Sequence, residues 1–513
     1  MENIQHQIIS CDGGLVLNRD TFTQPPGTAL QLQNFEPSIK GGYRRIGGTT
    51  KYTTSEFNDT NLSTTSKTGS GAILMSAVFG STVIAARGAV VGKSSGSGWT
   101  KIDESRTSAN KYTFDKYNFT GTDKIIFADG QNYAATYDGT NYVLLNGAAG
   151  AGSGTAPTAT ESVAVFRNHA FFAKSSSQEI TFSAPFSEND FTPANGAGSL
   201  STGDKVIGLA VFRERLFVFC RNSIWVLRGT NILDFALESV TRNIGCLDKF
   251  SIQEIGGDII FLAPDGLRTI AGTEKIGDVE LGSISKPIQE RVNDIGFDNI
   301  SSLVIREKSQ YRLFYPTTGG TEGATRGIIG TIKQSLAGNI GWQFGDIRGI
   351  KPACTDSGFN GTTELVVHGG YDGFVYKQES GNTFSGTNIV AFFRSPDVII
   401  GDAGTRKNMQ RVISNYQTEG SLTAELRVRY DYDSPDIPQP AAYTLTAGAG
   451  AAIYGSSGSA YGVSIYGSSG VPLIRQSVEG SGFAVAIKFD ESGGSAPFTL
   501  NGFQIEYTAG GRH

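Results

Sequence analysis

The feature that most constrains the fold is a series of short apolar runs separated by tight polar turns. The clearest example covers residues 205–229, where β-branched and aromatic runs are interrupted at residues 213–215 and again at 221–222. Runs of this kind, cut by turns of two or three residues, are typical of antiparallel strands joined by hairpins. None of them reaches the length that a buried helix needs. The segment is therefore predicted to form a meander of three strands.

The same unit recurs, loosely, along the middle of the chain. Copies or partial copies lie at residues 73–92, 125–145, 163–182, 252–270, 303–315 and 365–377. They follow one another at roughly 40 to 50 residues, which is typical of propeller blades. Because a four-stranded blade cannot bury both faces alone, several blades must close into a ring. Residues 61–385 are therefore predicted to form an all-β propeller of roughly six to eight blades. A β-solenoid and stacked sandwiches are the alternatives.

Composition agrees with many tight turns between short strands. Glycine supplies 67 of the 513 residues and proline only 16, so the chain is neither collagen-like nor proline-rich. Helical periodicity is scarce. The best candidate is residues 284–292, one or two turns with Ser285 as a candidate N-cap and Pro287 in the first turn.

The two ends of the chain differ from its middle. Residues 1–60 contain short strands and turns and are expected to form an N-terminal arm or platform. Residues 422–431 alternate strictly between apolar and polar side chains, as in a strand with one solvated face. Residues 386–513 are predicted to form a β-sandwich or barrel together with the N-terminal strands. Within them a Gly/Ser-rich repeat contains Tyr454 and Tyr466, which are candidates for contact with a neighbouring subunit.

Charge and hydropathy narrow the classes of partner. The formal net charge is −5, whereas a dedicated nucleic-acid binder is usually basic, so sequence-specific DNA reading is disfavoured. A mildly negative wall is still compatible with a conduit along which DNA slides. The first residues lack the pattern of a secretory signal, and no apolar stretch approaches 18 residues. We therefore expect no membrane span and assembly in a cytoplasm.

Residues that could carry chemistry are scattered. The four cysteines (Cys11, Cys220, Cys246, Cys354) and four histidines (His6, His169, His368, His513) show no metal-ligand spacing, and buried free thiols are expected. Several aspartates precede glycine (Asp129, Asp138, Asp265, Asp372). Asp-Gly is typical of hairpin turns, and this role is favoured over that of a catalytic carboxylate pair. Asp431 and Asp433 lack the rest of a calcium loop. The expectation is a protein without catalytic residues, cofactor or metal.

A resemblance to a known family begins where the propeller is approached. The segments Asn34-Phe35-Glu36-Pro37 and 41–52 are similar to the opening of tail nozzle proteins of short-tailed phages, which include the packaged-DNA stabilization and tail tubular B proteins. Gly47 stands where that family often has proline. Further similar segments follow in the same order at residues 223–229, 242–246, 261–266 and 497–507.

The resemblance implies a structural virion protein of the phage tail. It implies a ring, in this family a homohexamer, that extends the DNA channel below the portal-adaptor protein, retains packaged double-stranded DNA and docks tail fibres, a spike or a needle. Tyr43, Arg44 and Arg45 would then be assembly contacts. From the residues alone they could contact phosphate or an acidic partner, and an exposed strand with a solvated face is the alternative. Two other functions stay open: a propeller enzyme that hydrolyses or cleaves cell-surface glycans, and a glycan-binding adhesin.

Overall fold

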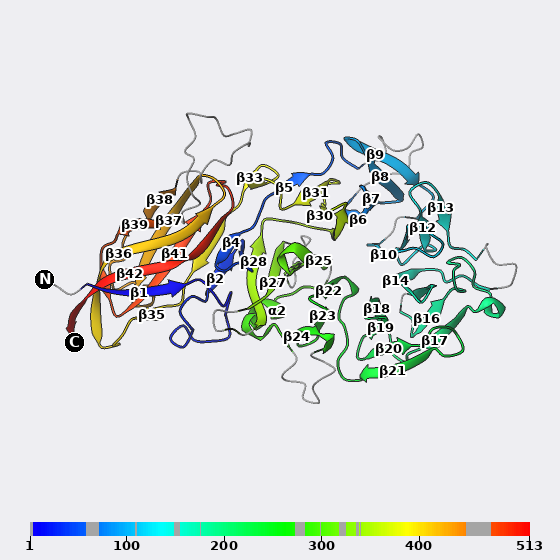
Figure 1. Ribbon diagram of the computed structural model, residues 1–513, viewed down its shortest axis with the longest axis horizontal. Helices are drawn as coiled ribbons and strands as arrows, with labels where there is room; N and C mark the ends of the chain where they lie inside the picture. Colours follow the sequence, from blue (N-terminus) through cyan, green and yellow to red (C-terminus); the bar gives the residue numbers. More distant parts are fainter. Residues whose placement is uncertain are drawn as a thin grey trace.

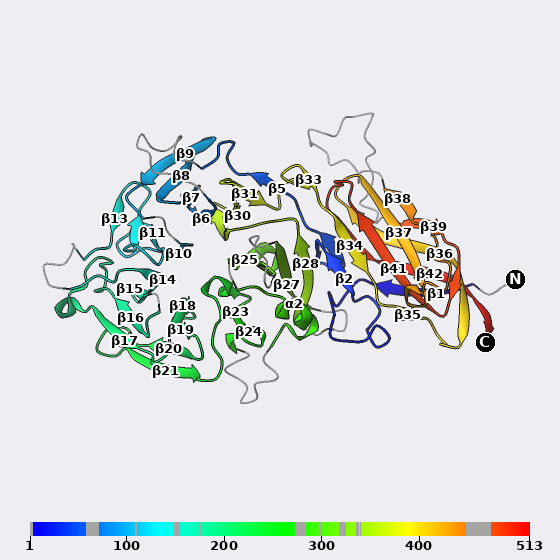
Figure 2. The same ribbon diagram turned by 180° about the vertical axis from the view of Figure 1, so that it is seen from behind.

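The structure is a computed structural model that describes residues 4–57, 71–107, 110–147, 154–174, 176–271, 283–297, 299–317, 325–334, 338, 340–447 and 473–512. A ring of small sheets occupies one side of the molecule and a β-sandwich the other (Figure 1). The view from behind shows the same two parts, with the end of β42 at the far tip of the sandwich (Figure 2).

Four blades of the ring are four-stranded antiparallel meanders that follow one another along the chain. Their strands are β6 (Ile73–Phe79), β7 (Thr82–Arg87), β8 (Val90–Ser95) and β9 (Gly98–Asp103); β10 (Thr113–Tyr117), β11 (Lys124–Ala128), β12 (Ala135–Tyr137) and β13 (Tyr142–Leu144); β14 (Thr160–Phe166), β15 (His169–Lys174), β16 (Glu179–Phe182) and β17 (Gly198–Ser201); and β18 (Val206–Phe212), β19 (Arg215–Cys220), β20 (Ile224–Arg228) and β21 (Ala236–Thr241).

Three further sheets complete the ring. They contain β22 (Gln253–Ile255), β23 (Asp258–Ala263) and β24 (Gly266–Thr269); β25 (Ser301–Ile305), β26 (Gln310–Tyr315), β27 (Arg326–Gln334) and β28 (Ile340–Arg348); and β29 (Cys354–Asn360), β30 (Thr363–Gly369), β31 (Val375–Gln378), β5 (Thr49–Lys51), β32 (Thr383–Phe384) and β33 (Thr387–Asn388).

The sheets close on themselves. Inner strand β10 contacts β14 and β14 contacts β18, while β22 contacts β25, β25 contacts β29 and β29 returns to β6. Six sheets are self-contained blades, and the β25–β28 meander fills the place between β22–β24 and β29–β31. The prediction of a β-propeller with an additional β-sandwich is confirmed, whereas an open solenoid would leave its two ends apart.

The strand β19 shows why the sequence produces blades. Leu216, Val218 and Cys220 pack toward the β14–β17 blade, and the alternate residues Phe217 and Phe219 pack toward β22–β24. A strand covered on both faces reads as an unbroken apolar run. At the β18–β19 turn Arg213 and Glu214 have φ of 46° and 59°, which are left-handed conformations. Such turns match the right-handed twist of a hairpin.

Polar side chains also join neighbouring blades. The carboxylate of Asp356 in β29 accepts the backbone N–H of Val78 in β6 at 2.8 Å. In the same way Asp115 in β10 accepts the N–H of Val165 at 2.7 Å, and the hydroxyl of Ser162 in β14 accepts the N–H of Leu209 at 3.0 Å. These bonds satisfy inner-strand donors that no ladder of the same blade reaches.

An N-terminal strand closes the last blade. β5 pairs antiparallel with β31, placing Thr49 opposite Gln378 and Lys51 opposite Tyr376. The propeller therefore begins before residue 61, where the sequence-based boundary was placed. The preceding strands belong to the sandwich, so the described residues 4–57 are divided between the two parts.

The sandwich is built from both ends of the chain. One sheet contains β3 (Phe35–Pro37), β4 (Tyr43–Arg45), β42 (Phe498–Arg512), β36 (Thr405–Thr418) and β39 (Leu473–Ser477), with β1 (Gln5–Ser10) on β42 and β40 (Ser481–Gly482) on β36. The other contains β2 (Gln31–Gln33), β34 (Ala391–Arg394), β41 (Ala484–Glu491), β37 (Leu422–Tyr430) and β38 (Tyr443–Ala447), with β35 (Val398–Ile399) on β41. Alternate residues of β37 are buried, as its sequence predicts.

The second sheet of the sandwich continues into the propeller. β2 pairs with β34 on one edge and, in parallel register, with β28 on the other, so Gln33 lies opposite both Phe392 and Asp346. One ten-stranded sheet thus runs from β25 to β38. The two parts are joined by one parallel bridge, beside which the N–H of Asn34 donates to the carbonyl of Asp346 at 2.7 Å, as well as by a side-chain interface.

Helical structure is sparse among the described residues. The expected helix at 284–292 is present as η5 (Lys286–Ile288) followed by α2 (Gln289–Asn293). Ser285 makes no side-chain cap, because its hydroxyl accepts the N–H of Leu267 at 3.0 Å. None of the described helices has the length and hydropathy to cross a membrane.

Candidate functional site

The hairpin of β3 and β4 carries three of the predicted contact residues, and two of them point inward. Tyr43 and Arg45 are both 0% exposed. The Tyr43 hydroxyl donates to the carbonyl of Gly27 at 2.6 Å, and Arg45 donates to the carbonyls of Ile46 and Ser495. The expectation of an exposed strand was wrong, because β42 and the opposite sheet cover this hairpin. These side chains serve the core of the sandwich.

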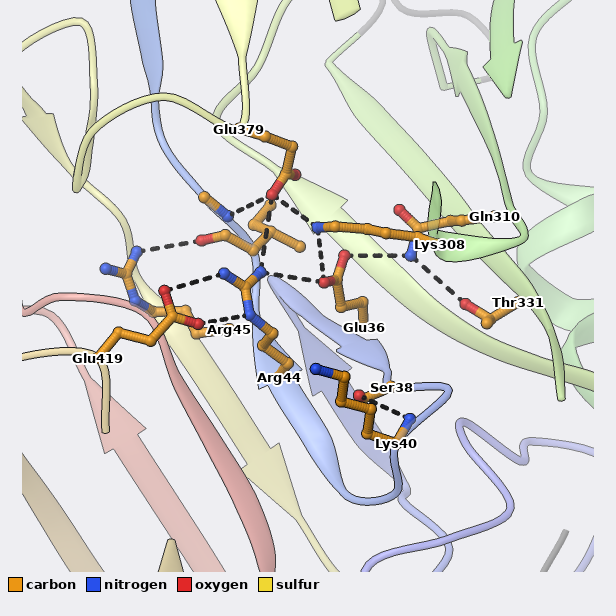
Figure 3. A network of polar contacts seen from close by, with 12 residues as sticks. Glu36, Ser38, Lys40, Arg44, Arg45, Lys308, Gln310, Thr331, Glu379 and Glu419 are labelled. Carbon is orange, nitrogen blue, oxygen red and sulfur yellow. Dashed lines mark hydrogen bonds and ion pairs between the residues drawn. The ribbon is translucent and has the colours of Figure 1, made fainter. Parts of the chain in front are cut away.

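Arg44 points the other way, into a network of charges at the junction of sandwich and propeller (Figure 3). Its Nε lies 2.9 Å from Oε1 of Glu419, and its Nη1 lies 3.2 Å from Oε1 of Glu36. Glu36 lies opposite Arg44 in the β3–β4 hairpin, and Glu419 is the first residue after the end of β36. Arg44 thus links two elements of the sandwich.

The propeller supplies the other half of the network. Lys308, the last residue of η6 (Arg306–Lys308), places its Nζ 2.8 Å from Glu36 and 2.7 Å from Glu379. Arg312 in β26 donates to the same two carboxylates, at 3.2 Å and 2.5 Å. Glu379 lies just beyond β31. Each carboxylate is therefore held by three cations, because Arg44 also lies 3.2 Å from Glu36 and 3.7 Å from Glu379, and each propeller cation spans both carboxylates.

These contacts fix the protonation of the two acids. Burial alone would raise the pKa of Glu36, but the ammonium of Lys308 and the guanidinium groups of Arg312 and Arg44 hold that pKa below its usual value. The pKa of Glu379 is lowered by Arg312 and Lys308 against the same effect of burial. Both are carboxylates at neutral pH, with every oxygen engaged. Such groups bind the two parts together and are poorly suited to transfer protons.

A polar pocket of about 260 Å³ opens beside the network. The β3–β4 turn, Lys308, Glu419 and the outward side chains Gln417 and Thr499 line it. Glu419, Lys308 and Arg44 are the most exposed charged groups of the network, with side chains 50%, 26% and 22% exposed.

Three of the aspartates that precede glycine hold turns, as predicted. Asp138 accepts the N–H groups of Thr140 and Asn141, Asp129 those of Gln131 and Asn132, and Asp372 that of Phe374, whereas Asp265 pairs with Arg268. Asp431 likewise accepts the N–H groups of Phe483 and Ala484. All four cysteines are buried free thiols. Within the described ranges, no group of three or more His, Cys, Asp or Glu side chains could hold a metal ion. Tyr454 and Tyr466 lie outside the described residues.

Sequence reasoning found Arg44 and missed its partners. Glu36 lies in the Asn-Phe-Glu-Pro segment, but its partner Arg312 is 276 residues further along the chain. Glu379, which also binds Arg312, follows 67 residues later. No local spacing connects such residues. The only available signal was a carboxylate inside an otherwise apolar short strand, which calls for a buried cation.

Comparison with known proteins leaves the family open. No family model matches the chain, and no curated protein matches it. Among solved structures, the extracellular domain of the one-component system BT4673 from B. thetaiotaomicron aligns at 10% identity and a TM-score of 0.37, over 60% of this chain and 38% of that one. The designed Ika8 protein aligns at 13% identity and 0.32, over 60% and 96%. The Neurospora crassa Pan2 WD40 domain aligns at 7% and 0.36, over 66% and 97%.

Proposed function

We propose that this protein is a structural subunit of a phage tail nozzle, which assembles into a ring that extends the channel for DNA. The observation that supports this is the continuous ten-stranded sheet between propeller and sandwich. The backbone bridge between β2 and β28, together with the ion pairs that Glu36 makes with Lys308 and Arg312, holds the two parts as one body. A body of this kind keeps its shape under load, which suits a ring of repeated subunits.

In this proposal the protein catalyses no reaction. The charged residues at the junction form ion pairs that stabilise the fold, and Asp-Gly pairs form turns. DNA would pass without sequence recognition, past walls of modest negative charge. The portal-adaptor and the fibre or needle proteins are its proposed partners, and the virion tail its proposed location.

The decisive experiment is the mass of the purified full-length protein at increasing concentration, by analytical ultracentrifugation, followed by electron microscopy. A closed ring, six-fold by the family resemblance, is expected. Truncating residues 1–50 or the final strand would be a poor probe, because β1 and β4 pair with β42 inside the sandwich core. A strictly monomeric protein that degrades members of a glycan panel would overturn the proposal in favour of a propeller glycosidase.

A further inference from the structure

The centre of the propeller holds a cavity of about 230 Å³ that is lined by polar as well as apolar side chains. Every sheet of the ring contributes to it, through the inner strands and the segments that lead into them. Two lysines line this cavity, Lys111 just before β10 and Lys249 in η3 (Lys249–Ser251). Neither lysine belongs to the charge network at the junction, and the proposed assembly of subunits does not involve them.

Both ammonium groups face one aromatic ring. Lys111 Nζ lies 4.2 Å from the centre of the Phe250 ring, and Lys249 Nζ lies 5.3 Å from it. Phe250 is fixed at both backbone groups, because its N–H donates to Asp248 at 2.7 Å and its carbonyl accepts from Ser302 at 2.5 Å. The two cations thus share one fixed aromatic support, and repulsion from Lys249 contributes to lowering the pKa of Lys111, so the two charges lie within electrostatic range of each other.

The carboxylates around the cavity are already engaged. Glu161 pairs with Lys249 at 3.6 Å, and Asp356 accepts from Val78 and lies 3.5 Å from Lys116. Lys111 donates to the carbonyl of Ile300 at 2.5 Å and, among the described residues, has no ion pair within 4.0 Å. Burial lowers the pKa of Lys111 to about 8, although Cys354 and Asp248 act in the opposite direction and Lys249 in the same one. The charge of Lys111 is therefore uncompensated by a direct partner.

A second, independent feature points to a missing acceptor. Ser301 is 1% exposed and lines the cavity, yet its hydroxyl has no hydrogen-bond partner among the described residues. A buried hydroxyl without a partner costs about 1–3 kcal/mol, so such groups usually meet a ligand or water. An anion with several oxygens could accept from the hydroxyl and from both ammonium groups.

We infer that the centre of the propeller binds a small oxyanion of the phosphate class, held by Lys111, Lys249 and the hydroxyl of Ser301. The cavity admits a free ion or a small monoester, and its volume excludes a nucleic-acid strand. The bound anion would join the β10, β22 and β25 sheets at the axis of the ring.

The test is calorimetric titration of the full chain with inorganic phosphate at pH 7, against sodium chloride of equal ionic strength. Saturable binding is expected in the wild type. Lys111→Met should weaken it at least about tenfold, the scale of one charge-assisted hydrogen bond, and Ser301→Ala should weaken it less. Lys377→Met, on the exposed face of β31, is the matched control and should bind as the wild type does. Methyl phosphate and acetate distinguish a monoester or a carboxylate from the free ion.

A second measurement uses the wild-type protein, so its outcome does not depend on whether Lys111→Met folds. Lysines of the wild-type protein are reductively methylated with a ¹³C label, and the Lys111 signal is followed by NMR. That signal should titrate near pH 8 without phosphate and at higher pH with it, because a bound anion stabilises the ammonium. An unmoved Lys111 titration, or equal phosphate affinity in wild type and Lys111→Met, would overturn the inference.

Discussion

At the scale of single residues, Arg312 is the cation on which the junction most depends. It is 1% exposed and contacts both Glu36 and Glu379, besides Gln310 and Gln378. Replacing it by methionine removes the charge but keeps much of the volume, and leaves two buried carboxylates undercompensated. Arg312→Met should lower the free energy of unfolding by about 3–5 kcal/mol in urea titrations. Glu307→Gln, exposed at the rim of the same pocket, is the control and should change it by less than about 0.5 kcal/mol.

The same carboxylates make stability depend on pH. Because the folded pKa values of Glu36 and Glu379 lie below the usual 4.5, each stabilises the fold above that pH and loses its contribution as pH falls through the folded value. Unfolding free energy should therefore decline below about pH 4.5. Glu379→Gln should be less stable than the wild type at pH 7 and approach it in acid. A constant difference between the two proteins from pH 7 to pH 3 would contradict this.

The junction also shows where reasoning from sequence stops. Arg44 and Arg45 are adjacent charged residues, and their exposure could not be inferred from their identity. Strand geometry sends them to opposite faces, and only the position of β42 makes the Arg45 face an interior. Glu36, Lys308 and Glu379 come from three distant segments, so their meeting follows from ring closure and from no local pattern.

At the scale of elements, Asp115 tests the bonds that join the blades. Burial raises its pKa from 3.8 to about 6, despite its hydrogen bond from Val165. A raised pKa means that stability is greatest below pH 3.8 and is lost as pH rises through 6. Relative to Asp115→Asn, which keeps an acceptor oxygen, the wild type should lose about 1–2 kcal/mol between pH 4 and pH 7. Parallel pH profiles of the two proteins, from urea unfolding, would refute the assignment.

The closing strand β5 is a second test at this scale. Tyr52 donates its N–H to the carbonyl of Val375 at 2.8 Å. Hydrogen-bonded pairs alternate along an antiparallel pair of strands, so the N–H of Thr50 faces Lys377, its register partner in β31. Thr50→Pro removes that donor and should cost about 3 kcal/mol or more. Amide hydrogen exchange should accelerate in β31 and leave β15 and β19 unchanged. Thr50→Ala keeps the donor and is expected to preserve protection in β31.

The elements that were predictable are those with local signatures. β19 was visible because its run of apolar residues is cut by turns at both ends, and β37 because its alternation matches a half-covered sheet. β5 was not, since Thr49–Lys51 is short and polar and becomes a blade strand only beside β31. The pairing of β5 could be assigned only once the structure showed that β31 has a free edge for it.

At the scale of the whole molecule, the shared sheet predicts that propeller and sandwich unfold together. β28 belongs to the ring and β2 to the sandwich, and their pairing crosses the boundary that a domain division would place between them. Scanning calorimetry should show one transition whose calorimetric and van't Hoff enthalpies agree. Arg312→Met should shift that transition without splitting it. Two resolved transitions in the wild type would show that this pairing is too weak to couple the parts.

The strand β42 has a consequence for folding. It forms the middle of its sheet, with β1 and β4 along one side and β36 along the other. A chain that stops before Phe498 therefore leaves three strands without the one they all pair with. The backbone groups that β1, β4 and β36 turn toward β42 would then lose their partners together, so this layer of the sandwich forms only when β42 is in place.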